Sequence, residues 1–352
     1  MAVAVPDDLD MALTPQWLTC ALQPRFPGLE VRAVARGPVV ERLSTNARFT
    51  IESVGVADVP RRLCIKGYFS DVGRTIGFVG EPEAAFYRDL AESTGVRTLS
   101  CVYADVDPKT RHGVVITRDE AAAGGEFLDG NSPFAVDQAA DALAELARLH
   151  ASAWTAERWA TAPWLQPRLG RAVQAWGEER TLEIMTANLN GPNGLDVPPA
   201  MRDARVLLAA HRRLSAAAPG PSSKGWCVIH GDAHVGNIMV DAAGRPRLVD
   251  WQLVQRGFWQ VDVGYLIAAT LSPERRRSAE RDLLWHYLEC LAAQGISPLS
   301  FDDAWPLLAD GMTHGFFLWS ITTKVAADVI AVLLSRLGTA VADHAGWAKG
   351  TP

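Results

Sequence analysis

Residues 227–240 read Cys-Val-Ile-His-Gly-Asp-Ala-His-Val-Gly-Asn-Ile-Met-Val, and residues 247–252 read Arg-Leu-Val-Asp-Trp-Gln. Within them, three short apolar runs are separated first by a polar loop and then by a turn, which predicts a strand, a loop and a β-hairpin. The loop carries Asp232 and Asn237, and Asp250 follows the hairpin. Carboxylate and amide oxygens in such small numbers suit Mg²⁺, which keeps several waters and shares substrate phosphates.

The spacing of these polar residues matches a kinase. Asp-x-x-x-x-Asn is the spacing of the kinase catalytic loop, and a further Asp after the next hairpin takes the place of the kinase metal-binding Asp. The form His-Gly-Asp-x-His-x-Gly-Asn with Asp-Trp-Gln resembles the aminoglycoside phosphotransferase and choline kinase superfamily. It looks most like the ecdysteroid-kinase-like branch of these small-molecule kinases. The resemblance implies that Asp232 is the catalytic base and that Asn237 and Asp250 hold Mg²⁺.

The resemblance also implies a fold and a division of the chain. The fold is α+β and bilobal, like that of protein kinases, with a five-stranded antiparallel sheet in the N-lobe and a mostly helical C-lobe. The expected parts are an N-lobe at 1–118, a hinge and linker at 119–131, and a C-lobe at 132–352.

The composition allows such an enzyme and disfavours other classes of protein. The chain has 352 residues, of which 48% are hydrophobic, so two lobes can form a core without disulfides. A formal net charge of −6 disfavours a nucleic-acid partner. The five cysteines form no Cys-x-x-Cys pair, and we find no leader-like segment and no 18-residue apolar run. These features predict a reduced, cytoplasmic protein without a membrane span.

The N-lobe is predicted from alternating polar and apolar residues, which indicate five strands at 31–35, 48–54, 62–68, 99–104 and 113–117. The loop between the first two strands, 37–47, matches the phosphate-covering loop of a kinase but lacks its glycines. The hydroxyl, amide and backbone N–H groups of Ser44, Thr45 and Asn46 could hold phosphate oxygens there. An ordinary hairpin turn would have the same pattern.

Lys66 lies in the middle of a predicted strand, among apolar neighbours. A lysine at such a position either extends to the surface or meets a partner. The resemblance implies that the partner is Glu83, in a Glu-x-x-Phe-Tyr segment that resembles the family's αC-like helix. The pair would direct Lys66 to the α- and β-phosphates of ATP. The alternative is two unrelated surface charges.

The run 114–120 occupies the place of the hinge, so the resemblance makes Thr117, Arg118 and Glu120 the expected nucleotide contacts. The family's apolar run often ends in Glu-Asp-Leu, whereas this chain has Arg-Asp-Glu. Backbone groups usually grip adenine there, so this difference leaves open the choice between ATP and GTP.

Two histidines and one acid near the catalytic loop have separate interpretations. His234, two residues after the base, either adds positive charge near the transferred group when protonated, and is then catalytic, or hydrogen-bonds within the loop. Asp262 matches a family Asp that accepts backbone N–H bonds from the catalytic loop. His150, at the end of a long predicted helix, is expected to form structural hydrogen bonds.

The predicted function is ATP-dependent transfer of the γ-phosphate to a hydroxyl of a small molecule. Residues 301–321 hold few acids but several large aromatics, which favours an apolar or amphipathic alcohol, although core packing would give the same pattern. These aromatics are Trp305, Phe316, Phe317 and Trp319. An aminoglycoside phosphotransferase is one alternative, and a non-catalytic nucleotide-binding regulatory protein is another. A protein kinase is disfavoured because Ala-Pro-Glu and an activation segment are absent from the sequence.

Overall fold

The computed structural model describes residues 4–297 and 299–344, and the chain forms two compact units. The first unit comprises the chain up to residue 126 together with 241–243 and 249–252, and the second comprises the remainder. In the described part of the chain, no helix is both long enough and apolar enough to cross a membrane.

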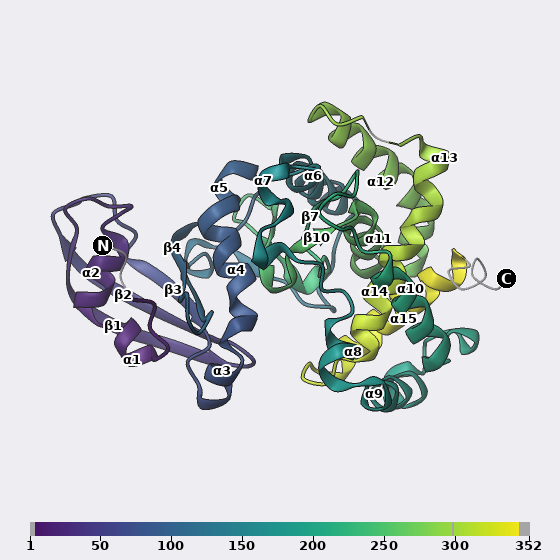
Figure 1. Cartoon of the computed structure of the whole chain (residues 1–352), viewed down its shortest axis with the longest axis horizontal. Helices are drawn as coiled ribbons and strands as arrows, with labels where there is room; N and C mark the ends of the chain where they lie inside the picture. The colour runs from purple at the N-terminus through teal and green to yellow at the C-terminus, as the bar shows by residue number, and fades with distance from the viewer. Residues whose placement is uncertain (1–3, 298, 345–352) are drawn as a thin grey trace. The chain divides into compact units, whose positions relative to one another are not determined.

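The first unit contains the predicted five-stranded antiparallel sheet, in the order β1-β2-β3-β5-β4 (Figure 1). Its strands are β1 (Glu30–Glu41), β2 (Thr45–Val54), β3 (Arg62–Gly67), β4 (Cys101–Val106) and β5 (Gly113–Arg118). The first two strands are longer than predicted, so the loop between them shrinks from 37–47 to 42–44. The pairing shifts register between Arg36 and Val39, which absorbs the Gly-Pro dipeptide as an irregularity instead of ending the strand.

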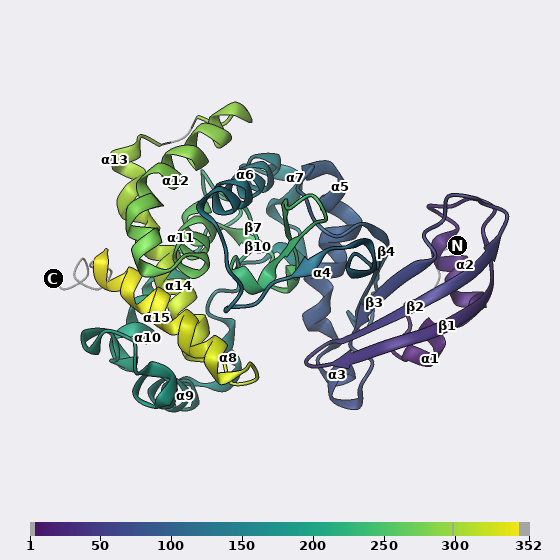
Figure 2. The same ribbon diagram turned by 180° about the vertical axis from the view of Figure 1, so that it is seen from behind.

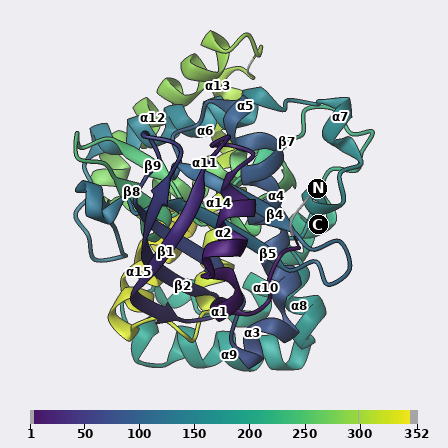
Figure 3. The same cartoon turned by 90° about the vertical axis from the view of Figure 1, so that its left-hand side faces the viewer.

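Helices cover both faces of this sheet. On one face, α1 (Leu9–Ala12) and α2 (Pro15–Leu22) pack against alternate residues of the strands, such as Phe49 and Ile65, to form the core. Figure 3 shows α2 lying against the strands. The hydroxyl of Thr14 caps α2 by accepting the N–H of Trp17, as Thr-Pro at its start predicts.

The opposite face carries the αC-like segment. It consists of α3 (Asp71–Thr75), η1 (Gly77–Gly80), α4 (Glu81–Ala85), a π-helical turn η2 (Phe86–Leu90) and α5 (Ala91–Thr94). Because neighbouring residues of a strand point to opposite faces, Lys66 points away from the core that contains Ile65. It therefore points toward the side on which α4 packs.

The second unit is mostly helical, as predicted for a C-lobe. Its helices are α6 (Val136–Ser152), α7 (Glu157–Ala160), α8 (Arg171–Trp176), α9 (Glu178–Asn190), α10 (Ala204–Ala216), α11 (Trp259–Thr270), α12 (Pro273–Ala293), α13 (Phe301–Ala304), α14 (Leu308–Ser320) and α15 (Ala327–Asp343). Every residue of α11 is buried, which is typical of a helix at the centre of a core. Figure 2 shows α12, α14 and α15 beside it.

Short strands surround the loop that the sequence singled out. The strand β7 (Cys227–Ile229) pairs with β10 (Gln255–Gly257), and β8 (Ile238–Val240) pairs with β9 (Pro246–Leu248). A two-residue strand, β6 (Glu126–Phe127), is the neighbour of β8. The predicted strand, loop and hairpin therefore form, with the last strand one residue earlier than expected.

Candidate active site

Lys66 and Glu83 form a buried ion pair in the first unit. The Nζ of Lys66 on β3 lies 2.7 Å from Oε2 of Glu83 on α4, whose side chain is 5% exposed. The same Nζ lies 3.1 Å from Oδ1 of Asp250. Burial opposes the charge on Lys66, but Asp250 and Glu83 outweigh it and raise the pKa of the ammonium group. The contact expected between Lys66 and Glu83 is confirmed, and Asp250 joins it.

The turn at Asp250 is strained and firmly anchored. Asp250 has φ 63°, in the left-handed region that few non-glycine residues adopt. The indole of Trp251 stacks on Phe86, with ring centroids 3.8 Å apart, and its N–H donates to the hydroxyl of Thr98. Strain of this kind persists where neighbouring contacts hold it, often at functional sites. The Asp250 side chain is 41% exposed, so a ligand can reach it.

The anchoring of Trp251 was missed from the sequence, although the two stacked rings both belong to noted motifs. Phe86 belongs to Glu-x-x-Phe-Tyr, and Trp251 belongs to Asp-Trp-Gln, whereas Thr98 lies in neither. Burial, the largest influence, raises the pKa of Glu83, and a hydrogen bond with the Trp251 backbone is among the contacts that oppose this rise. The αC-like segment thus contacts both Lys66 and the turn that presents Asp250.

The predicted phosphate-loop residues lie at the end of the sheet near Lys66. Asn46 is the register partner of Lys66, and Thr45 is the register partner of Gly67, so both belong to β2 rather than to a loop. Ser44 remains in the loop, and its carbonyl accepts the N–H of Arg42.

The predicted hinge residues differ in their surroundings. Thr117 is buried and pairs with Cys64, so it shares a face of the sheet with Lys66. Arg118 pairs with Leu63 and is exposed. The carboxylate of Glu120 accepts the backbone N–H of Ser100 at 3.0 Å. Thr117 therefore lies on the same face of the sheet as Lys66, and Arg118 lies on the opposite face. The carboxylate of Glu120 is engaged by the backbone of Ser100.

In the second unit, the carboxylate of Asp262 accepts hydrogen bonds from the backbone of the loop that carries Asp232. Its Oδ2 accepts the N–H of His230 at 2.6 Å, and its Oδ1 accepts the N–H of Gly231 at 2.8 Å. The Nε2 of His150 lies 3.2 Å from Oδ2, and its Nδ1 lies 2.8 Å from the hydroxyl of Tyr287. The expectations for Asp262 and for a structural His150 are both confirmed.

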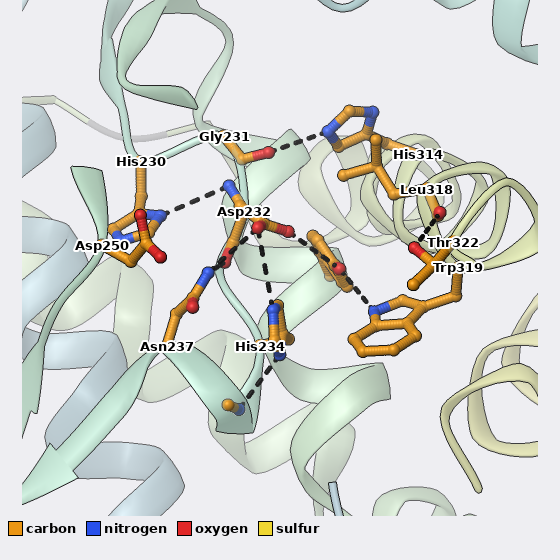
Figure 4. A network of polar contacts seen from close by, with 12 residues as sticks. His230, Gly231, Asp232, His234, Asn237, Asp250, His314, Leu318, Trp319 and Thr322 are labelled. Atoms are coloured by element: carbon orange, nitrogen blue, oxygen red, sulfur yellow. Dashed lines mark hydrogen bonds and ion pairs between the residues drawn. The ribbon is translucent and has the colours of Figure 1, made fainter. Parts of the chain in front are cut away.

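The carboxylate of Asp232 is surrounded by hydrogen-bond donors (Figure 4). The amide nitrogen of Asn237, in η7 (Val235–Asn237), donates to the Asp232 carbonyl at 2.9 Å and to its Oδ2 at 3.0 Å. The hydroxyl of Tyr265 donates to Oδ1 at 3.1 Å. Burial favours a higher pKa for Asp232, but His234, then His230 and Tyr265, outweigh it and lower the pKa to about 2. The side chain is 27% exposed, so this ionised group is accessible.

His234 takes part in the structure of the loop. Its Nδ1 accepts the N–H of Gly236 at 3.0 Å, and its Nε2 lies 3.7 Å from Oδ2 of Asp232. Nδ1 is therefore engaged by the loop backbone, and Nε2 is the ring nitrogen that faces Asp232. Of the two interpretations left open by the sequence, the hydrogen bond within the loop is the one that this geometry matches.

Helix α14 supplies a second layer behind Asp232 that the sequence did not reveal. The indole N–H of Trp319 donates to the hydroxyl of Tyr265 at 2.8 Å, and the Trp319 ring lies edge-on to His234 at 5.1 Å. The Nε2 of His314 lies 2.9 Å from the carbonyl oxygen of Gly231. A signal for Tyr265 was available, because it follows Asp262 by three residues and so lies on the same helix face.

The aromatic residues of 301–321 lie in different surroundings. Phe316 and Phe317 are fully buried, and Phe317 stacks on His211 with ring centroids 3.6 Å apart. Trp305 stacks instead on Phe301. For Phe316 and Phe317, core packing is therefore the interpretation that the structure matches, and these two rings carry no argument about the acceptor.

The described residues offer few groups that could bind a metal ion, and those near Asp232 and at Asp250 are oxygen atoms. In residues 4–297 and 299–344, no group of three or more His, Cys, Asp or Glu side chains could hold a metal ion. Both amide hydrogens of Asn237 are used toward Asp232, which leaves its carbonyl oxygen as a ligand. The exposed carboxylate of Asp250 in the first unit likewise offers oxygen atoms, and oxygen atoms are the ligands that Mg²⁺ prefers.

Comparisons with known proteins place the chain among phosphotransferases. Residues 80–299 match the model of the phosphotransferase enzyme family. Among solved structures, the chain is similar to choline kinase from Cryptosporidium parvum, at 12% identity and a TM-score of 0.50, with 97% of this chain and 94% of that chain covered. Two further similar structures have lower TM-scores. For choline kinase LicA from Streptococcus pneumoniae, the identity is 14% and the TM-score is 0.46, with 89% of this chain and 94% of that chain covered. For macrolide 2'-phosphotransferase type I, the identity is 18% and the TM-score is 0.45, with 95% of this chain and 99% of that chain covered. No curated protein sequence matches the chain.

Proposed function

The chain belongs to the phosphotransferase enzyme family, and we propose that it transfers the γ-phosphate of ATP to a hydroxyl of a small, apolar or amphipathic molecule. The observation that carries this proposal is the ionised, accessible carboxylate of Asp232, held by donors on both of its oxygens. A regulatory protein that only binds nucleotide would have no use for a carboxylate so arranged.

In the proposed reaction, Asp232 acts on the acceptor. Its carboxylate accepts a hydrogen bond from the acceptor hydroxyl and so directs the oxygen at the γ-phosphorus. The bond from the acceptor oxygen to phosphorus forms while the bond to the β-phosphate oxygen breaks, and ADP leaves. A carboxylate with a pKa of about 2 is a weak base, so it takes the proton late, when the hydroxyl has become acidic.

In this proposal, residues of the first unit bind the phosphates of ATP. Lys66 binds the α- and β-phosphates, and Glu83 fixes the direction of its side chain. Ser44, Thr45 and Asn46 bind phosphate oxygens at the end of the sheet where the register places Asn46 beside Lys66. Thr117, Arg118 and Glu120 contact the base of the nucleotide, Glu120 through its backbone because its carboxylate bonds with Ser100.

We assign Asn237 and Asp250 as the protein ligands of Mg²⁺. Mg²⁺, when bound, offsets the negative charge of the phosphates. Asn237 has a second task, because its amide group fixes the carboxylate of Asp232. For His234 we propose a role beside the carboxylate: its Nε2 faces Oδ2 of Asp232 and helps to fix the direction of that side chain.

The proposed acceptor class rests on the side chains around Asp232. In the described part of the second unit, its carboxylate is contacted by the phenol of Tyr265, the imidazole of His234 and the amide of Asn237, and none of these three is acidic. An aminoglycoside carries several ammonium groups and calls for several carboxylates. The acid Asp310 is instead bonded to Gln260.

A panel of acceptors tests the proposal. ADP release from Mg·ATP is measured with sterols, terpenoid alcohols and kanamycin-type aminoglycosides, for the wild type and for Asp232→Asn. We expect release with one of the apolar or amphipathic alcohols and loss of it in the variant. Release with aminoglycosides and with no other compound refutes the acceptor class but leaves the kinase. Binding of Mg·ATP without turnover of any hydroxyl compound supports the regulatory alternative.

A further inference from the structure

Two aromatic residues from two different helices are linked to Asp232 by consecutive hydrogen bonds, a chain that runs from Trp319 through Tyr265 to the carboxylate. We propose that Tyr265 on α11 is a positioning residue for Asp232 and that Trp319 on α14 fixes the direction of the Tyr265 hydroxyl hydrogen. The inference rests on the proposed function in one respect, since it takes Asp232 as the group that binds the acceptor hydroxyl.

The direction of the hydrogen bonds follows from the chemistry of the groups. An indole N–H can donate but cannot accept, so Trp319 must donate to the oxygen of Tyr265 at 2.8 Å. The phenol has a single hydrogen, and the remaining partner within reach is Oδ1 of Asp232 at 3.1 Å. Trp319 therefore holds Tyr265 as a donor to the carboxylate, and this favours the ionised form of Asp232.

The two helices approach so closely that the chain is built into the fold. A Cβ atom on Gly315 of α14 would lie 2.3 Å from Cδ2 of Tyr265, so glycine makes the space that the phenol ring occupies. A Cβ on Gly311 would lie 2.4 Å from the carbonyl oxygen of Gln260, and one on Gly264 would lie 2.1 Å from that of Leu308. Because glycines on both helices permit this contact, Trp319 can reach Tyr265, which is itself fully buried.

The carboxylate is held from both sides by this arrangement. Tyr265 binds Oδ1, while Asn237 binds Oδ2, so rotation of the Asp232 side chain would break one of the two bonds. A carboxylate oxygen has two acceptor positions, and Oδ1, which accepts the Tyr265 hydroxyl, keeps one of them for a hydrogen bond from an acceptor hydroxyl. The consequence is a base with a fixed orientation before the substrate arrives.

The test measures phosphoryl transfer and unfolding in single and double variants. In Tyr265→Phe we expect kcat to fall by roughly tenfold, the size expected for one lost hydrogen bond to a charged group, while the KM for ATP stays unchanged. In Trp319→Phe we expect a smaller fall in kcat, because Tyr265 can then turn its hydrogen away. In the Asp232→Asn background neither change should lower kcat further, because both residues act through the carboxylate.

Matched controls separate positioning from general destabilisation. Tyr103→Phe removes a buried hydroxyl that has no hydrogen-bond partner in the described part of the chain, and Trp285→Phe alters a half-exposed indole. Neither control should change kcat. An unchanged kcat in Tyr265→Phe overturns the role of Tyr265, and a fall there without one in Trp319→Phe overturns the role of Trp319. Should Tyr265→Phe fail to fold, an unchanged kcat in Trp319→Phe still overturns the chain.

Urea unfolding gives a readout that does not depend on catalysis. The losses of stability in Tyr265→Phe and Trp319→Phe should not add in the double variant, because both changes break the same hydrogen bond, and additive losses overturn the chain. Full activity in Asp232→Asn contradicts instead the proposed function.

Discussion

Replacement of Asp232 by asparagine should disturb the protein more than its similar shape suggests. The contacts described above to the carboxylate oxygens come from donors: Tyr265 at Oδ1, and Asn237 and His234 at Oδ2. An amide has one acceptor oxygen and one NH₂ group, so one donor of the protein must face another donor. The NH₂ group should face Tyr265, since that orientation sacrifices one bond and preserves the contacts of Asn237 and His234.

Two lines of reasoning give the size of the effect. A buried donor left without an acceptor costs about 1–3 kcal/mol. A pKa of about 2 for Asp232, compared with 3.8 in an unperturbed carboxyl, corresponds to about 2 kcal/mol in favour of the ionised form. Because the side chain is partly exposed, we expect the free energy of unfolding at pH 7 to fall by about 1–2 kcal/mol.

The pH dependence of this loss has a definite sign. The lowered pKa of Asp232 stabilises the fold above the unfolded pKa of about 4, and this contribution is lost as the pH falls toward 2. The difference in unfolding free energy between the wild type and Asp232→Asn should therefore narrow as the pH falls below about 4. Urea unfolding at several pH values measures it, and a difference that widens in acid would contradict the assignment.

The double variant provides the stricter test. Tyr265→Phe deprives the Trp319 N–H of its acceptor in either background, but in the asparagine background it breaks no bond to residue 232, so its further loss of stability should be smaller there. In the wild-type background, the same change should destabilise the protein. If the two losses in unfolding free energy simply add, the hydrogen bond between Tyr265 and Asp232 is not formed and the reasoning fails. Phosphoryl transfer by Asp232→Asn should fall by roughly 10²–10⁴-fold, with Mg·ATP affinity little changed.

Three further changes test the rest of the structure. Asp250→Ala should abolish Mg²⁺-dependent ATP binding in calorimetry while the protein remains folded, and binding equal to that of the wild type would remove Asp250 from the metal site. Lys66→Ala and Glu83→Ala should each weaken Mg·ATP binding, and a double-mutant cycle should give a coupling of about 0.5–3 kcal/mol, whereas additive losses would mean that the ion pair does not serve the nucleotide. Gly311→Ala should lower the free energy of unfolding by about 1–3 kcal/mol, because the added Cβ meets carbonyl oxygens of α11. This loss should exceed the gain of about 1 kcal/mol that alanine brings to a helix. A more stable variant in urea unfolding would show that the two helices can separate without cost.

The sequence by itself determined the features that depend on neighbouring residues. The three apolar runs around Asp232 and Asn237 predicted a strand, a loop and a hairpin, and β7, β8 and β9 form in that order. Thr14-Pro15 and Ser272-Pro273 are dipeptides typical of a helix start, and each hydroxyl accepts a backbone N–H three residues later. Capping, turns and side-chain alternation are short-range effects, so a reader of the sequence has all the interacting groups in view.

The tertiary structure decided which partner each buried face meets. Tyr265 and Trp319 are 54 positions apart, and periodicity assigns each to the buried side of a helix without saying which helix lies opposite. For the same reason the sequence left open whether Phe316 and Phe317 contact an acceptor or pack in the core, and they are buried in the core. The close approach of α11 and α14 depends on Gly264 in α11 and on Gly311 and Gly315 in α14, which lie at least 47 positions further along the chain. Side-chain periodicity repeats within one element, but the fit between two elements depends on the shapes of both surfaces, and those shapes exist only once the chain has folded.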